Sequence, residues 1–299
     1  MAAPPVSASV ARVDPVALAQ VRRRLARAVE PPWLHGEVAR RMAERLPLVK
    51  LQPVTVLDWS GPGGASIAPL RAAYPRATLQ AVQDDDMPAP PARPPRWWPF
   101  ARAAAVEHRR MAEVPESAAQ LLWSNMALHG HADLPDLLQR WHRAVAVGGF
   151  LMFSTLGPGS LAELRALYRQ MGWPEPMAPL VDMHDLGDAL AQAGFADPVM
   201  DQETLTLTWT EAPRLLAELR TLGGNVAPGR HPGLRTPRWR EQLQEALLAH
   251  AVDGRMALSF EVVYGHAFRV ARRARVAAET TLPLEDLRAQ LKPGRTSST

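Results

Sequence analysis

The segment 54–64 places an acidic residue directly before a cluster of glycines, in the order VTVLDWSGPGG. An apolar run ends at Asp58, and a helical pattern starts just beyond the glycines. Glycine lets a ligand approach the backbone closely, and a helix N-terminus offers unpaired N–H groups. This order is typical of a nucleotide-binding turn, although a plain tight turn between strand and helix has the same composition. The expected ligand-lining residues are Gly61, Gly63 and Gly64.

A second polar group follows the short apolar strand predicted for residues 121–124. Ser124 and Asn125 end this strand, and ligands of parallel sheets bind at the carboxyl ends of strands. We assign both residues to positioning roles in catalysis; the alternative is that the asparagine simply forms the turn. We expect His129 and His131, close by, to be solvated, because no third ligand has the spacing of a metal site. The sequence therefore predicts no metal centre.

Composition excludes several functional classes. The chain has 299 residues and no cysteine, which removes disulfides, thiolate nucleophiles and cysteine-based zinc sites. No apolar run approaches the length of a membrane span. The net charge is only +4, and we attribute the pI near 10.1 to many dispersed arginines, not to a concentrated basic face. We expect a cytoplasmic protein that binds no nucleic acid.

The elements that position these residues alternate along the chain. The predicted strands cover residues 55–57, 77–82, 103–108, 121–124, 150–154, 204–209 and 256–270. The predicted helices cover two stretches within residues 15–46, then residues 67–74, 134–145, 160–171, 184–193, 213–222 and 237–251. Gly148 and Gly149 are expected to close the helix before the fifth strand. The alternation indicates an α/β fold with a mostly parallel sheet covered on both faces.

We expect a single domain over residues 20–270, with a flexible leader at residues 1–19 and a polar tail at residues 271–299. The leader is rich in arginine and alanine, which loosely resembles a mitochondrial transit peptide. An ordinary leader before an arginine-rich helix is the preferred interpretation.

A proline-rich insertion at residues 84–100 interrupts the domain. It cannot form a regular helix, because proline lacks the N–H donor and its ring fixes the backbone. Trp97 and Trp98 within it are candidates to stack on a ligand base, and equally candidates to plug the core.

Five segments carry a family resemblance. They are residues 33–46 (WLHGEVARRMAERL), 121–129 (LLWSNMALH), 148–165 (GGFLMFSTLGPGSLAELR), 215–230 (LLAELRTLGGNVAPGR) and 254–268 (GRMALSFEVVYGHAF). Together they resemble the class I S-adenosylmethionine-dependent methyltransferases, and among these the malonyl-acyl-carrier-protein O-methyltransferases of biotin synthesis. Methyltransferase-like assembly factors of mitochondrial complex I look related as well.

The resemblance implies a Rossmann-like fold, with a seven-stranded, mostly parallel sheet and an antiparallel last strand. It implies S-adenosylmethionine as cofactor and methylation of the free carboxylate of a malonyl thioester on acyl carrier protein or coenzyme A. The cofactor-binding positions that it implies are Asp58, Ser60, Gly61, Gly63, Gln83, Asp84 and Trp123. An arginine in the family-like segments, Arg165 among them, would clamp the second carboxylate of the malonyl group.

The chain departs from the family pattern at the first two strands. Family members carry acid-x-Gly-x-Gly-x-Gly after the first strand, whereas Trp59 and Ser60 follow Asp58 here and are expected to crowd the methionine end of the cofactor. The acid that would hold the ribose hydroxyls aligns with Gln83 or, if the register shifts by one residue, with Asp84.

Two further departures concern the adenine side. The acid expected after the third strand aligns with Arg109 or Arg110, and the proline-rich insertion replaces a helix. Two functions therefore stay open: an active methyltransferase, or a methyltransferase-like protein that works as an inactive binding or assembly partner. A hydroxylase-like role, suggested by the assembly factors, is a weaker third option.

Overall fold

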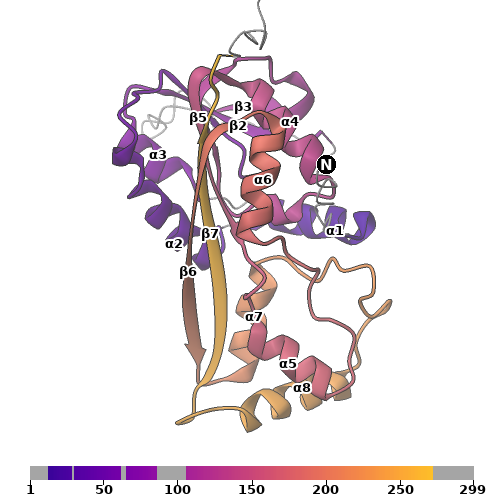
Figure 1. Cartoon of the computed structure of the whole chain (residues 1–299). Coiled ribbons are helices and arrows are strands. Elements are labelled where there is room, and N and C mark those ends of the chain that lie inside the picture. Colours follow the sequence, from indigo (N-terminus) through magenta and orange to yellow (C-terminus); the bar gives the residue numbers. More distant parts are fainter. Residues whose placement is uncertain (1–12, 29, 62–64, 86–105, 272–299) are drawn as a thin grey trace, which may run out of the picture.

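The computed structural model describes residues 13–28, 30–61, 65–85 and 106–271 (Figure 1). The predictions made for the proline-rich insertion, for Trp97 and Trp98, for Gly63 and Gly64 and for most of the leader and tail lie outside these residues. No helix within the described ranges is long and apolar enough to cross a membrane.

One sheet of seven strands organises the molecule. In spatial order its strands are β3 (Glu107–Arg110), β2 (Thr78–Gln83), β1 (Thr55–Asp58), β4 (Ala119–Ser124), β5 (Val145–Leu156), β7 (Met256–Phe268) and β6 (Ala196–Trp209). The first five strands of the chain are parallel, and β7 runs antiparallel to both of its neighbours. This confirms the predicted α/β fold with its antiparallel last strand.

Helices cover both faces of the sheet, as predicted. They are α1 (Pro15–Ala26), α2 (Trp33–Ala43), α3 (Ile67–Ala73), α4 (Leu134–Ala144), α5 (Ala162–Gln170), α6 (Met183–Ala193), α7 (Ala212–Thr221) and α8 (Pro237–Ala249). Val56 of β1 packs in the core cluster under α2 and α3, while Leu57 packs in the cluster under α4 and α6. Successive side chains of a strand point to opposite faces, so β1 is buried on both.

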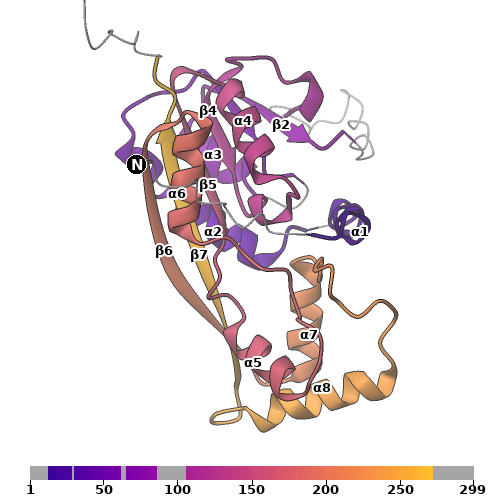
Figure 2. The same cartoon turned by 45° about the vertical axis from the view of Figure 1, so that its right-hand side comes forward.

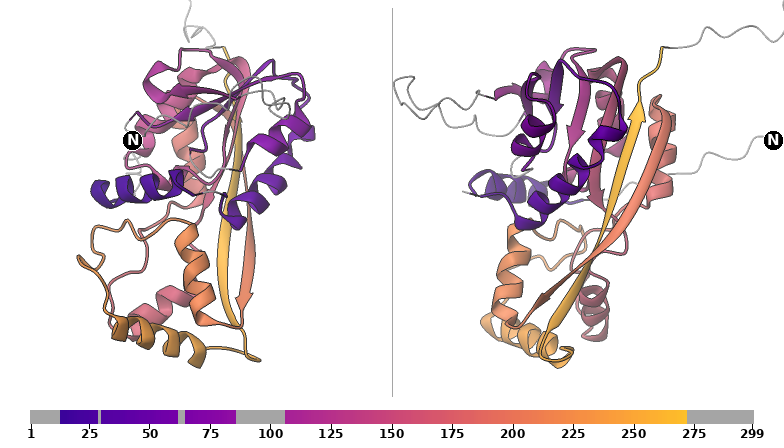
Figure 3. Two further views of the ribbon diagram at one scale, coloured as in Figure 1. Left: turned by 180° about the vertical axis from the view of Figure 1, so that it is seen from behind. Right: turned by 90° about the vertical axis from the view of Figure 1, so that its left-hand side faces the viewer.

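The long strands β6 and β7 extend beyond the other strands and reach a lower lobe of α5, α7 and α8 (Figures 1 and 3). Helix α1 stands apart from the sheet and lies above this lobe (Figure 2). Its Asp14 N-cap accepts N–H groups of the first turn, and the Asp14 N–H donates to the Val226 carbonyl at 2.7 Å. Helix α1 is thereby attached to the segment that follows α7.

Several predicted boundaries were wrong, among them the start of the strand expected at residues 204–209, which begins at Ala196. Gly148 and Gly149 do not close α4 but lie inside β5, which begins directly after that helix. A Cβ on Gly149 would come within 2.6 Å of the Gln120 carbonyl oxygen, so close strand packing requires glycine there. The third strand runs past His108 to Arg110 because it is the sheet's edge strand, where charged side chains can reach water.

Candidate functional site

The turn after β1 is built around the Ser60 hydroxyl, which is buried. It donates to Asp58 Oδ1, lies 2.9 Å from Ser66 Oγ and accepts the Asn125 backbone N–H at 2.8 Å. The Ser60 N–H also donates to Asp58 Oδ1 at 3.1 Å. Ser66 Oγ in turn accepts the indole N–H of Trp123 at 2.9 Å. A glycine at this position would lack the hydroxyl, so the departure at Ser60 has a structural role in joining β1 to β4.

Ser60→Ala should lower the free energy of unfolding by about 1–3 kcal/mol, because buried polar partners are left unsatisfied. Urea denaturation of the variant and of the unmodified chain measures this difference. Equal stability would show that the hydroxyl is not the hub of the turn.

Asp58 is fully enclosed at the end of β1. Burial raises the pKa of its carboxyl to about 6, against the opposing effect of the Ser60 and Ser66 hydrogen bonds. The side chain is 7% exposed and is not part of the cavity lining. Asp58 therefore holds the turn in shape and does not face the cavity.

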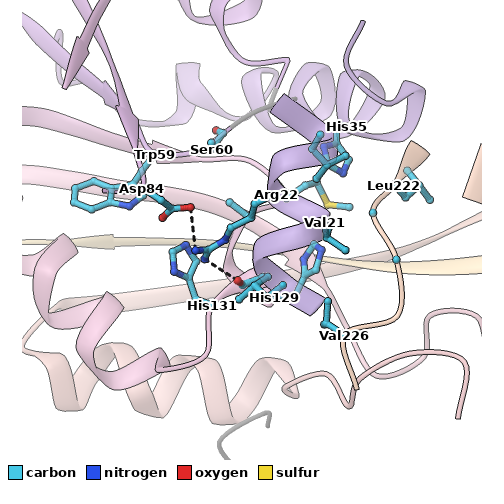
Figure 4. A pocket seen from close by; sticks show the side chains of 18 of the residues that line it. Val21, Arg22, His35, Trp59, Ser60, Asp84, His129, His131, Leu222 and Val226 are labelled. Carbon is cyan, nitrogen blue, oxygen red and sulfur yellow. Dashed lines mark hydrogen bonds and ion pairs between the residues drawn. The ribbon is translucent and has the colours of Figure 1, made fainter. Parts of the chain in front are cut away.

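Asp84, directly after β2, borders a cavity at the carboxyl ends of β1, β2 and β4, and Gln83 does not (Figure 4). Of the two residues that the sequence left open, Asp84 is thus the one that borders the cavity. The Asp84 carboxylate pairs with the Arg22 guanidinium of α1 at 3.1 Å, and Arg22 also donates to the Gly130 carbonyl at 2.9 Å. Arg22 thus ties α1 to the ends of two strands.

The cavity has a volume of about 110 Å³ and lies between the strand ends, α1 and the segment after α7. Its strand-end wall comprises Trp59, Ser60, Gly61, Val82, Asp84 and Met111. Leu18, Val21, Arg22 and Leu25 of α1 and residues Leu222, Gly223, Gly224 and Val226 face it. His35, Met126, Ala127, His129, Gly130 and His131 complete the lining.

Arg22 was missed by the sequence reasoning, although a signal was present. Leu18, Val21, Arg22 and Leu25 follow the spacing of one helical face, so a charged residue interrupts an apolar stripe. A charge in such a position needs a partner, and Asp84 supplies it.

Arg22→Gln should loosen α1 and increase amide hydrogen exchange over residues 15–26. Arg23→Gln is the matched control, because Arg23 is exposed. Among the described residues its guanidinium donates only to the Ala19 carbonyl of its own helix, at 3.2 Å. Exchange measured by mass spectrometry should rise in the first variant alone. The same exchange in both variants would contradict the role given to the ion pair.

Trp59 is only 3% exposed and packs in the core cluster under α4 and α6. Its edge borders the cavity, and its indole N–H has no hydrogen-bond partner among the described residues. The expected crowding by this ring therefore amounts to one wall of the cavity.

The other predicted residues of β4 hold the backbone together. Ser124 donates to the Trp59 carbonyl at 3.2 Å. Asn125 donates to the His35 carbonyl at 2.8 Å and accepts the Ser154 hydroxyl at 2.7 Å. Neither residue, nor the buried Trp123, borders the cavity, so within the described structure their roles are positional.

Arg165 lies on α5 in the lower lobe. Its guanidinium donates to the Pro158 carbonyl, which closes the turn before the helix. It does not border the cavity, so the structure does not bring it to the other candidate residues.

His129 and His131, which were expected to be solvated, are half-buried. Both border the cavity, and burial lowers the pKa of His129 to about 4 and that of His131 to about 3. The turn that carries them folds against α1, a contact that residue types alone do not reveal. Both imidazoles are neutral at physiological pH.

The strand order, the antiparallel β7 and the cavity beyond the ends of β1, β2 and β4 define a Rossmann-like class I methyltransferase fold. The chain belongs to the malonyl-[acyl-carrier protein] O-methyltransferase family. The family member from Laribacter hongkongensis is 38% identical over 256 residues, which cover 81% of this chain and 84% of that protein. The one from Methylovorus sp. is 37% identical over 293 residues, which cover 94% of this chain and 97% of that protein. The one from Gallionella capsiferriformans is 36% identical over 247 residues, covering 80% and 85%. No family model matches the chain.

Proposed function

We propose that this chain is an S-adenosylmethionine-dependent O-methyltransferase that esterifies the free carboxylate of a malonyl thioester. The relatives carry the name of this activity. The observation that carries the proposal is the Asp84 carboxylate, which borders a cavity at the carboxyl end of β2. A carboxylate at this place can accept both hydroxyls of a ribose.

Three features of the strand-end wall fit such a cofactor. Asp84 is the acceptor for ribose hydroxyls. Gly61 has a φ of +67°, and no atom lies within 4 Å of the place where its Cβ would stand, so backbone and ligand can approach there. Val82 and Met111 offer an apolar surface for a base.

Bound S-adenosylmethionine would supply a methyl group that is already activated by its sulfonium centre. The acceptor carboxylate is ionised at neutral pH, so no side chain has to remove a proton. The chain's contribution is to align the carboxylate and to exclude water. Arg22 is the only arginine or lysine among the described residues that line the cavity. The Arg22 guanidinium retains N–H donors beyond those used by Asp84 and Gly130. We assign to it the binding of the negatively charged acceptor carboxylate.

Isothermal titration of the purified chain with S-adenosylmethionine and S-adenosylhomocysteine tests the cofactor. We expect binding at micromolar concentration. No heat at millimolar ligand would overturn the proposal.

One observation favours the inactive binding or assembly protein as a second candidate. Arg22 already occupies the carboxylate of Asp84, and the cavity of about 110 Å³ is smaller than the roughly 300 Å³ at which ligand pockets begin. The titration separates the two candidates, because an inactive protein of this kind would not bind the cofactor.

A further inference from the structure

Two basic segments meet beside the cavity. Helix α1 contains three consecutive arginines and no acidic residue. Residues 219–230, part of which packs against this helix, contain two arginines and no acidic residue. The expectation of dispersed arginines does not hold in this part of the molecule.

Packing brings the two segments into contact. A Cβ on Gly224 would lie 3.1 Å from an Arg24 guanidinium nitrogen and 3.3 Å from a γ carbon of Val21. Gly223, next to it, would lie 3.4 Å from the other γ carbon of Val21. Because Val21, Gly223 and Gly224 also line the cavity, Arg24 stands at its rim.

The charges at this rim are not compensated by acids within the described residues. Burial and the nearby Arg220 charge lower the pKa of Arg24, which shows two like charges held close together. Arg27 lies three residues beyond Arg24, so the two share a helix face. None of the ion pairs between described residues involves Arg24, Arg27 or Arg220, and all three are exposed. Only Arg230 of the adjoining segment is paired, with Asp14.

Like charges gathered on an exposed surface cost free energy unless a partner of opposite sign meets them. The charges here come from two elements and spread along a helix, which suits a protein surface better than a single small anion.

We propose that Arg24, Arg27 and Arg220, the basic rim, dock the acidic surface of a carrier protein whose thioester arm reaches the cavity that α1 and residues 222–226 border. This inference rests on the proposed function, because it names the face on which the carrier of that substrate binds.

The test uses the double variant Arg24→Glu/Arg220→Glu in the full chain, with two malonyl thioesters as substrates. One is carried on purified acyl carrier protein, and the other on pantetheine without a protein. We expect kcat/KM to fall at least about tenfold for the carrier-bound substrate and to stay unchanged for the pantetheine thioester. Arg76→Glu, an exposed reversal after α3, on the side of the molecule opposite α1, is the control and should change neither value (Figure 1).

An unchanged kcat/KM with the carrier, or an equal loss with both substrates, would overturn the docking surface. Binding of the carrier protein alone, followed by fluorescence anisotropy, keeps the inference testable if neither thioester is methylated. Weaker carrier binding only in the double variant would then support the surface while the proposed function fails. Tighter binding of duplex RNA than of the carrier, lost in the same variant, would assign the surface to nucleic acid and overturn the inference.

Discussion

Asp84→Asn is expected to weaken S-adenosylmethionine binding by about tenfold to a hundredfold. The carboxylate would accept ribose hydroxyls in charge-assisted hydrogen bonds, and each such bond contributes roughly 1.5–3 kcal/mol. The amide keeps one acceptor but loses the charge. Titration calorimetry on the purified variant measures the dissociation constant directly.

The neighbouring residue supplies a matched control. The Asp85 carboxylate accepts the Ala112 N–H at 3.0 Å and does not border the cavity. Asp85→Asn removes the same charge one residue away and should leave the affinity unchanged. Equal losses in both variants would show that overall charge, not the position of Asp84, governs binding.

Asp58→Asn is expected to stabilise the protein at alkaline pH. The folded-state pKa of about 6 lies above the ordinary 3.8, so the folded chain binds the extra proton between these values. The stabilisation that the raised pKa gives the folded chain is complete below about pH 4 and is lost as the pH rises through 6. A shift of about two units corresponds to roughly 3 kcal/mol. Asparagine carries no charge, and its oxygen can still accept the two Ser60 bonds.

Urea denaturation at about pH 4 and about pH 8 tests this expectation. The variant should exceed the unmodified chain by about 2–3 kcal/mol at the higher pH and by little at the lower. A variant that is less stable at both would mean that the charged carboxylate is a net stabilising element of the turn.

Local patterns were sufficient for the sheet. Val56 and Leu57 pack in the cores on opposite faces of the sheet. This alternation, like the spacing of apolar residues in the helices, can be recognised from residues close together in the sequence. Contacts between distant segments were not accessible in this way. Gly148 and Gly149 have the composition of a helix end, and it is the Gln120 backbone on a neighbouring strand that requires glycine inside β5.

The site shows the same division. The acid after β2 could be located only to one of two residues, because a shift of one residue reverses which side chain faces the ligand. His129 and His131 are half-buried because α1 folds over their turn, which lies more than 100 residues away in the sequence. The hydrogen bond from the Arg22 guanidinium to the Gly130 carbonyl joins the two. Ser60 was expected to crowd the cofactor. Its role in holding the turn depends on hydrogen bonds to Asn125 and Ser66, which only the folded structure brings around it.

The most direct test of the account is the product itself. The purified full chain is incubated with malonyl-pantetheine and S-adenosylmethionine carrying a deuterated methyl group, and the thioester is examined by mass spectrometry. We predict a labelled methyl ester on the free malonyl carboxylate, formed far more slowly by the Asp84→Asn variant. Bound cofactor without any labelled ester, on this thioester or on malonyl-acyl carrier protein, would contradict the account.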